Sequence, residues 1–232
     1  MNKDRHIVAI GGGGFRLEPD NLLLETYILS LCAIEKPKVG FLPTASADNQ
    51  EYIEAFHKSF TKLGAIPSHL SLFTPHTKDL KQYIENLDIL FVGGGNTKNM
   101  LALWREWNLI DPIRNAYDQG TVMAGVSAGS ICWFEQGVTD SYGVSLESLE
   151  CMGILKGSNC PHYDSEVERK PRYHQLLKQG MKPGFAAEDG VALHFKNEVF
   201  YQAISNRPDG QAFEVSAEGE KTLNISYLGN QS

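Results

Sequence analysis

The stretch TVMAGVSAGS, residues 121–130, places a serine between two glycines directly after a short apolar run. In the pattern Gly125-x-Ser127-x-Gly129, the serine sits on a tight turn from strand to helix with its hydroxyl group exposed. Free N–H groups at the start of the following helix would point at this serine and stabilise negative charge on a substrate carbonyl oxygen. A turn of small residues that only packs a helix onto a sheet has the same pattern, so the neighbouring residues must decide.

The composition is that of a globular protein rather than a nucleic-acid-binding or membrane protein. The chain has 232 residues, of which 42% are hydrophobic and 21% charged, and its formal net charge is −7. We therefore expect a single domain over residues 1–232 and no nucleic-acid partner. No apolar run reaches the roughly 18 residues of a membrane span, so no membrane partner is expected either. Four scattered cysteines and the lack of a signal-peptide core near the N-terminus predict a cytoplasmic protein with reduced thiols.

Apolar runs alternate with amphipathic segments over the first 130 residues. Strands are predicted at residues 6–10, 38–42, 69–73, 88–92 and 121–126. Helices are predicted at residues 20–34, 50–63 and 78–86, with further helical segments through 100–104 and 113–117. This alternation favours an α/β fold with a mainly parallel sheet flanked by helices. Near the C-terminus we expect antiparallel strands that extend or flank the same sheet, at residues 191–195, 198–204, 211–215 and 223–228.

Four of the predicted strands end in clusters of small residues. These clusters lie at residues 11–14, 43–46, 93–97 and 125–130. Ligands of parallel sheets bind outside the carboxyl ends of the strands, so the clusters predict a cleft around Ser127. The glycines at 11–14 fail the dinucleotide fingerprint, because positions 16 and 17 are arginine and leucine. We interpret them as a flexible turn on the rim of the cleft and expect no cofactor.

A serine nucleophile needs a general base, and the base needs an acidic group to orient it. Most of the seven histidines fall inside predicted strands or amphipathic helices, but His162 lies in a loop directly after a proline, where it is the best candidate for the base. The acidic candidates Asp140, Asp164, Glu188 and Asp189 remain open on these grounds. No His-Glu-x-x-His motif and no cluster of histidines and cysteines is present, so we expect no metal site.

Four motifs occur together in a specific order. They are Gly-Gly-Gly-Asn-Thr at 93–97, Gly-Val-Ser-Ala-Gly-Ser at 125–130, Pro-His-Tyr-Asp at 161–164 and Asp-Gly-Val-Ala-Leu at 189–193. In this order they resemble the motifs of the peptidase E and cyanophycinase family, and the Leu-Pro-Thr-Ala strand end at 42–45 fits as well. The members of that family are serine peptidases on a fold similar to the class I glutamine amidotransferases.

The resemblance implies a role for each matched residue. Ser127 would attack the peptide carbonyl, and His162 would act first as general base and then as general acid to the leaving amine. Backbone N–H groups of Gly94, Gly95 and Ala128 would form the oxyanion hole. For the acidic member the resemblance favours Asp189, followed by Glu188, and last by Asp140, which lies closer to the nucleophile in sequence, as in peptidase E.

The resemblance also implies the reaction. We expect a serine exopeptidase of the dipeptidase or aminopeptidase type, which hydrolyses short peptides through an acyl-enzyme and exists as a monomer or homodimer. Peptidase E itself carries an arginine after the nucleophile that is thought to bind an aspartyl side chain, whereas residues 131–138 contain none. Strict aspartyl specificity is therefore not expected, unless Arg169 or Arg172 substitutes from another loop. Trp133 and Phe134 either line an apolar pocket or pack in the core as part of a helix that follows the serine.

Two other functions fit parts of the sequence. A short-chain esterase of the α/β-hydrolase kind would use Ser127, Asp140 and His162 in that chain order, although its usual His-Gly-Gly-Gly loop is absent. A binding protein without catalysis could retain the same cleft. A glutaminase is disfavoured, because those domains use cysteine where this chain has Ser127.

Overall fold

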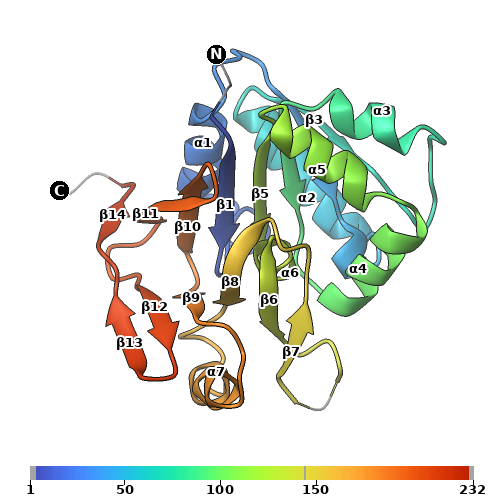
Figure 1. Ribbon diagram of the computed structural model, residues 1–232. Helices are drawn as coiled ribbons and strands as arrows, with labels where there is room; N and C mark the ends of the chain where they lie inside the picture. Colours follow the sequence, from blue (N-terminus) through green and yellow to red (C-terminus); the bar gives the residue numbers. More distant parts are fainter. Residues whose placement is uncertain (1–3, 144, 230–232) are drawn as a thin grey trace.

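The computed structural model describes residues 4–143 and 145–229, which form two β-sheets with helices packed mainly on the first (Figure 1). In the first sheet the central strands β1, β5, β4, β2 and β3 are parallel, β10 runs antiparallel to β1, and β11 runs antiparallel to β10. The eight strands, in spatial order, are β14 (Ile225–Tyr227), β11 (Val199–Ser205), β10 (Val191–Lys196), β1 (His6–Ile10), β5 (Val122–Val126), β4 (Ile89–Val92), β2 (Lys38–Leu42) and β3 (Ile66–His69).

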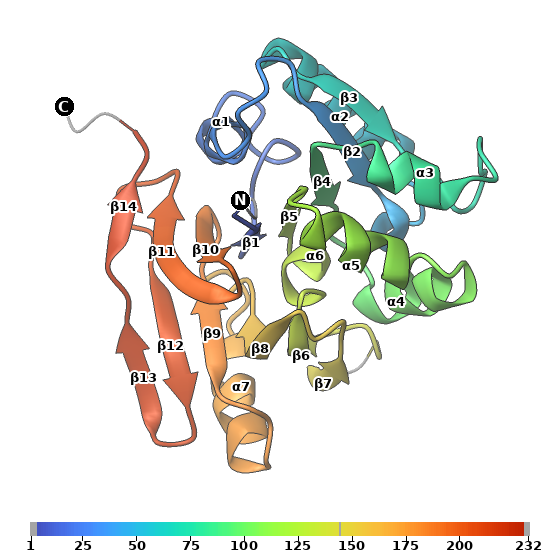
Figure 2. The same ribbon diagram turned by 45° about the horizontal axis from the view of Figure 1, so that its top comes forward.

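Helices cover both faces of this sheet, as Figure 2 shows. Alternate residues of β1 point to opposite sides: Val8 and Ile10 join a core with α1 and α2, whereas Ile7 and Ala9 join a core with α3, α4 and α5. The helices are α1 (Leu23–Ser30), α2 (Gln50–Lys62), α3 (Leu80–Glu85), α4 (Thr97–Glu106), α5 (Ile110–Asp118), α6 (Ala128–Ile131) and α7 (Arg169–Lys178), with a 3₁₀ turn at Thr44–Ser46.

Local sequence signals set the ends of the regular elements. Helix α2 begins at an asparagine cap, where the Asn49 side chain accepts a hydrogen bond from the Tyr52 N–H group. The helix ends at Lys62, two residues before Gly64, whose φ of +83° is the left-handed conformation that stops a helix. Within the described part of the chain, no helix combines the length and the apolar character that crossing a membrane requires.

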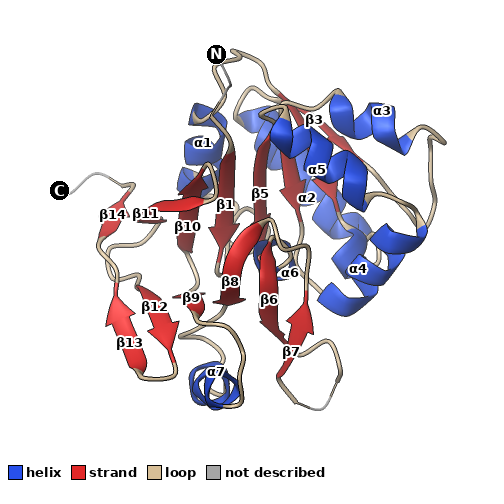
Figure 3. Ribbon diagram, in the orientation of Figure 1, coloured by secondary structure: helices blue, strands red, loops and turns tan. Residues whose placement is uncertain are grey.

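A second sheet of six strands lies beside the first (Figure 3). Its buried face packs against α7, whose Tyr173 and Leu176 contact a core that includes Val138 and Phe213. Strands β6, β8 and β9 are parallel, whereas β7, β12 and β13 pair antiparallel to their neighbours. The strands, in spatial order, are β13 (Gly219–Thr222), β12 (Ala212–Ser216), β9 (Gly184–Ala187), β8 (Leu155–Cys160), β6 (Phe134–Thr139) and β7 (Glu147–Glu150).

The structure confirms the predicted fold class and corrects several of its details. The mainly parallel sheet and its flanking helices are present, but the last strands divide between the two sheets, and β14 pairs parallel with β11 rather than antiparallel. The helix predicted after Ser127 is present but short: α6 ends at Ile131, and Phe134 begins β6 instead of continuing that helix. Trp133 and Phe134 are fully buried in the core, so they line no pocket. The third strand covers residues 66–69 rather than 69–73.

Candidate active site

Ser127 lies on the sharp turn between β5 and α6, in a backbone conformation that residues other than glycine rarely adopt. Its φ and ψ are 56° and −109°, a strained geometry that costs on the order of 1–3 kcal/mol and has to be held by its surroundings. Two glycines make the turn possible, because a Cβ on Gly125 would lie 2.3 Å from the Gly129 carbonyl oxygen and one on Gly129 would lie 2.1 Å from the Val92 carbonyl oxygen. The Gly-x-Ser-x-Gly pattern is therefore required by close packing on both sides of the serine.

His162 comes from the second sheet, in the loop after β8. Its φ is 54°, so the residue after Pro161 turns sharply and brings the ring to the serine. The His162 Nε2 atom lies 2.9 Å from the Ser127 Oγ atom. The ring is mostly buried, with 19% of its side chain exposed. A histidine that comes from one sheet is thus in hydrogen-bond contact with a serine that comes from the other.

Asp189 lies on the turn where the chain passes from β9 of the second sheet to β10 of the first. Its Oδ1 atom lies 2.7 Å from His162 Nδ1. An ionised carboxylate can only accept, so Nδ1 carries the hydrogen and Nε2 is left as the acceptor for the serine O–H group. Partial burial opposes ionisation of Asp189, but the hydrogen bond from His162, together with smaller contributions from neighbouring groups, holds the pKa of Asp189 below its ordinary value.

Gly12 occupies the space directly behind this hydrogen bond. A Cβ at this position would lie 1.8 Å from Asp189 Oδ1 and 2.6 Å from His162 Nδ1. The Gly12 carbonyl oxygen also accepts a hydrogen bond from the Gly190 N–H group at 3.0 Å. The glycines after the first strand, which we interpreted only as a turn on the rim, therefore include one that the histidine and the aspartate touch.

Two of the other acidic candidates, Asp164 and Glu188, support the Asp189 turn without a hydrogen bond to the histidine. Asp164 accepts the Asp189 N–H group at 2.9 Å, and the Glu188 carboxylate pairs with Arg207 at 2.8 Å. Arg207 also donates to the Asp189 carbonyl oxygen at 2.8 Å. Within the described residues, neither the Glu188 carboxylate nor the exposed Asp140 makes a hydrogen bond to His162.

Backbone N–H groups lie next to Ser127 on two sides. Ala128 is the first residue of α6, so its N–H group has no acceptor within the helix. The Gly94-Gly95 loop packs against the serine so closely that a Cβ on Gly94 would lie 3.2 Å from the Ser127 Cβ atom. The Gly94 N–H group donates to the Tyr52 hydroxyl at 3.3 Å, whereas no protein acceptor for the Gly95 or Ala128 N–H group is found among the described residues.

A small pocket of about 160 Å³ opens beside the serine and the histidine. Arg16 lies at its rim, with the guanidinium carbon 4.6 Å from the centre of the Tyr52 ring. The residues that line it are Gly13, Arg16, Leu17, Tyr52, Gly94, Gly95, Val126, Ser127 and His162. A larger cavity of about 770 Å³ lies over the second sheet, but none of Ser127, His162 and Asp189 lines it.

Arg16 is not among the arginines expected at the site, and those two arginines lie elsewhere. Arg169 is buried and donates to Glu166 and to the Val138 carbonyl oxygen. Arg172 is bonded to Glu147, and neither lines the pocket beside Ser127. A signal for Arg16 was present, since it follows the glycine cluster at the carboxyl end of the first strand. The described residues include no group of three or more His, Cys, Asp or Glu side chains that could hold a metal ion.

Comparison with known proteins identifies the family. Residues 7–202 match the sequence profile of peptidase family S51. The chain belongs to this family. It is a serine peptidase, a hydrolase that acts on peptide bonds, and the predicted resemblance to the peptidase E family is confirmed.

Relatives of the S51 chain match it over most of their length. This chain is 50% identical over 230 residues to the uncharacterized peptidase YgaJ of Bacillus subtilis (strain 168). The alignment covers 97% of this chain and 100% of that protein. A probable alpha-aspartyl dipeptidase of Drosophila melanogaster is 26% identical over 207 residues, which are 80% of this chain and 82% of the relative. The crystal structure of a peptidase from an acI-B1 Actinobacterium superposes with a TM-score of 0.76 at 16% identity, covering 97% and 96% of the two chains, and so shares the fold.

Proposed function

We propose that this S51 peptidase is a serine exopeptidase that cleaves short peptides through an acyl-enzyme on Ser127. The observation that carries the proposal is the unbroken chain of hydrogen bonds from Asp189 through His162 to Ser127, with distances of 2.7 and 2.9 Å. A serine, a base and an orienting acid in this arrangement are the parts that acyl transfer needs. Glu188 and Asp140 have no catalytic role in this proposal, although Glu188 supports the turn that carries Asp189.

The first half of the reaction forms the acyl-enzyme. His162 Nε2 takes the hydroxyl proton while Ser127 Oγ bonds to the peptide carbonyl carbon, and Asp189 stabilises the imidazolium that results. The N–H groups of Ala128 and Gly95 donate to the oxyanion, with Gly94 holding their loop against the serine. The tetrahedral intermediate then loses the amine, which receives its proton from His162.

The second half releases the acyl group. A water molecule gives a proton to His162 as its oxygen attacks the ester carbonyl, and the second tetrahedral intermediate breaks the bond to Ser127 Oγ. The proton on His162 returns to Oγ, so the serine is regenerated and the acyl group leaves as a carboxylic acid. No metal or cofactor is needed to balance these steps.

The size of the pocket supports action on short peptides. Its volume of about 160 Å³ is smaller than the roughly 300 Å³ at which sites for drug-sized ligands begin. Such a pocket accommodates one end of a peptide better than the middle of a long chain.

Action in the cytoplasm is also part of the proposal, because Cys32, Cys132, Cys151 and Cys160 are free thiols.

The test is mass spectrometry of a defined library of di- and tripeptides, incubated with the wild type and with Ser127→Ala. We expect the wild type to release terminal residues, and the variant to lose at least about 10⁴-fold in kcat/KM because no nucleophile remains. A fluorophosphonate should label the wild type at Ser127 and leave the variant unlabelled. Equal cleavage by both proteins would refute the mechanism, whereas hydrolysis of short-chain esters alone would refute the peptidase chemistry.

A further inference from the structure

We propose that Arg16 binds a carboxylate group of the substrate, and this proposal rests on the proposed function. Arg16 is exposed at the rim of the small pocket that Ser127 and His162 line. Of the described residues that line the pocket, it is the only one with a permanent charge. A peptide that enters the pocket therefore meets a cation beside the nucleophile, although the whole chain carries a formal net charge of −7.

The guanidinium of Arg16 is not used for an ion pair within the protein. Four other arginines, Arg5, Arg169, Arg172 and Arg207, each pair with a carboxylate at 2.7–2.8 Å. For Arg16 the described residues offer no such partner, and its interaction is with the face of the Tyr52 ring. A guanidinium donates hydrogen bonds in its own plane. Contact of its face with an aromatic ring therefore leaves its N–H groups free to donate two parallel hydrogen bonds to a carboxylate.

The loop that carries Arg16 is fixed on both sides. The preceding residue, Phe15, is 2% exposed and inserts into a cluster of aromatic rings, with the Phe41, Tyr52 and Phe91 rings 5.4–6.2 Å away. The Phe15 N–H group donates to the buried Glu25 carboxylate at 2.8 Å. Packing of Phe15 therefore holds the backbone that carries Arg16 beside the pocket, and less ordering is needed when a ligand binds.

The start of the same loop contacts the histidine and the aspartate. Gly12 packs against His162 and Asp189, and the N–H groups of Leu17 and Glu18 both donate to the Gly14 carbonyl oxygen. The loop thus links the hydrogen-bonded chain at one end with a cation at the other. This is the arrangement of a subsite that aligns a charged substrate on the nucleophile.

The carboxylate has two chemical sources in a short peptide. It is either the α-carboxylate at the C-terminus or an acidic side chain next to the scissile bond, and both present the same planar group to a guanidinium. Only a short peptide places its C-terminus in a pocket next to the scissile bond, so the first source agrees with an enzyme that acts on short substrates. The second source does not depend on peptide length.

The experiment starts from any peptide that the wild type cleaves and compares matched pairs. One pair differs only by amidation of the C-terminus, and the other exchanges aspartate for asparagine next to the scissile bond. For the pair that supplies the bound carboxylate, Arg16→Gln should lower kcat/KM on the acid by about 10- to 100-fold and leave the amide nearly unchanged, so that the preference for the acid disappears. Arg16→Lys should restore part of the preference, because it keeps the charge but not the fork.

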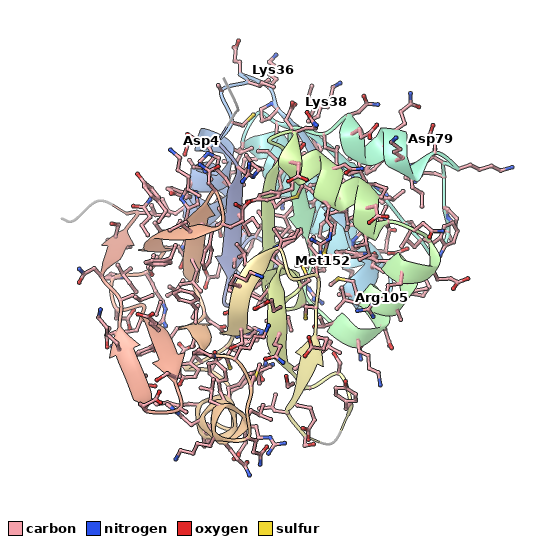
Figure 4. The ribbon with its side chains drawn as sticks, viewed as in Figure 1. Asp4, Lys36, Lys38, Asp79, Arg105 and Met152 are labelled. Carbon is pink, nitrogen blue, oxygen red and sulfur yellow. The ribbon has the colours of Figure 1, made fainter. Side chains whose placement is uncertain are left out.

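Arg105→Gln is the matched control. Arg105 is an exposed arginine near the end of α4, beside Met152 and outside the pocket (Figure 4), so the variant carries the same change of charge. It should keep the wild-type preference. Equal loss on acids and amides in Arg16→Gln, or no loss at all, would overturn the role of Arg16 while peptide cleavage stands. If the wild type cleaves no peptide, the proposed function fails and this inference fails with it.

Discussion

The two sheets contribute unlike parts to the candidate site. The first sheet supplies Ser127 from the buried strand β5, in which every residue is buried. The second sheet supplies His162 after β8, a strand that mixes exposed and buried residues. Asp189 belongs to the connection between the sheets, after β9 and before β10. Ser127 is thus positioned by a local turn, whereas His162 and Asp189 are positioned by how the two sheets pack together.

Close backbone packing holds the junction between the sheets. A Cβ on Gly11 would lie 2.3 Å from the Glu188 carbonyl oxygen, so the end of β1 touches the end of β9 directly. The buried Asn159 side chain of β8 donates to the Ser130 hydroxyl of α6 at 2.6 Å. Because these contacts lie within a few residues of Ser127, His162 and Asp189, changes at the junction should affect turnover more than changes of similar size elsewhere.

The largest expected effect comes from the acid at the junction. Asp189→Asn should lower kcat about 10³- to 10⁴-fold, since an amide can donate to Nδ1 and so leave the hydrogen on Nε2, where it blocks proton transfer from the serine. Steady-state kinetics on a cleaved peptide would measure the loss. Glu188→Gln is the control, because its carboxylate pairs with Arg207 rather than His162, and it should lose less than about 10-fold. Equal losses in the two variants would contradict the assignment of the acid.

The next effect comes from closing the space between the sheets. In Gly12→Ala the new methyl group would overlap Asp189 Oδ1 and His162 Nδ1, so the two side chains must move apart. We expect kcat to fall by about 10²-fold or more and the free energy of unfolding to fall by about 1–3 kcal/mol.

Gly64→Ala separates strain from this overlap. Gly64 has a φ of +83° and nothing within 4 Å of an added Cβ, so this variant should lose about 1 kcal/mol of stability through its backbone alone. Its kcat should equal that of the wild type. If Gly12→Ala also kept full kcat, the junction would not control the geometry of the site.

The same contrast explains what could be predicted from the sequence. The strands of the first sheet are short apolar runs, and the predicted strands at 6–10 and 38–42 match β1 and β2 residue for residue. Strand β8 reads Leu-Lys-Gly-Ser-Asn-Cys, with a glycine at φ +81° and a buried Asn159, and carries no such pattern. Its burial depends on pairing with β6 and β9, which no local signal encodes.

The site was predictable only in part, for a similar reason. The motifs drew attention to Ser127, His162 and Asp189, and the geometry now gives each one a hydrogen-bond partner, although their roles remain proposals. The contact of Gly12 with the aspartate joins segments 177 residues apart in the chain, and the position of Arg16 depends on how Phe15 is buried. Contacts between segments that are far apart in the chain produce no local hydrophobic pattern from which they could be predicted.

On the side of the first sheet, a buried carboxyl group should make stability depend on pH. Burial raises the pKa of Glu25 from 4.5 to about 7, while the unfolded chain ionises at the ordinary value. Between these two values the unfolded state loses its proton first, so the free energy of unfolding should fall as the pH rises, by up to about 3 kcal/mol, and stay level above pH 7.

Glu25→Gln tests this dependence through denaturant unfolding at pH 5 and pH 8. The variant cannot ionise, so it should be more stable than the wild type at pH 8, and this advantage should shrink or reverse at pH 5. Its carbonyl oxygen can still accept the Phe15 N–H group. Glu51→Gln, on the exposed side of α2, should follow the wild type at both values. A difference of the same size at pH 5 and pH 8 would rule out titration of Glu25.

On the side of the second sheet, the guanidinium of Arg207 holds the Asp189 turn. We expect the smallest effect from the loss of this group. Arg207 donates to the Asp189 carbonyl oxygen and pairs with Asp164 and Glu188 at 2.7–2.8 Å. It is 30% exposed, so each pair is partly screened by solvent. Arg207→Gln should therefore loosen the Asp189 turn and lower kcat by about 10-fold with little change in KM.

The matched control for Arg207 is Arg172, which has a similar exposure of 23% and pairs with Glu147 at 2.8 Å, away from the three site residues. Arg172→Gln should keep the wild-type kcat. Titration of the reactive serine with a fluorophosphonate gives kcat per intact site, which should fall in Arg207→Gln and stay at the wild-type value in Arg172→Gln. A role limited to stability would lower the number of titrated sites without lowering kcat per site, and the titration therefore distinguishes positioning of Asp189 from support of the fold.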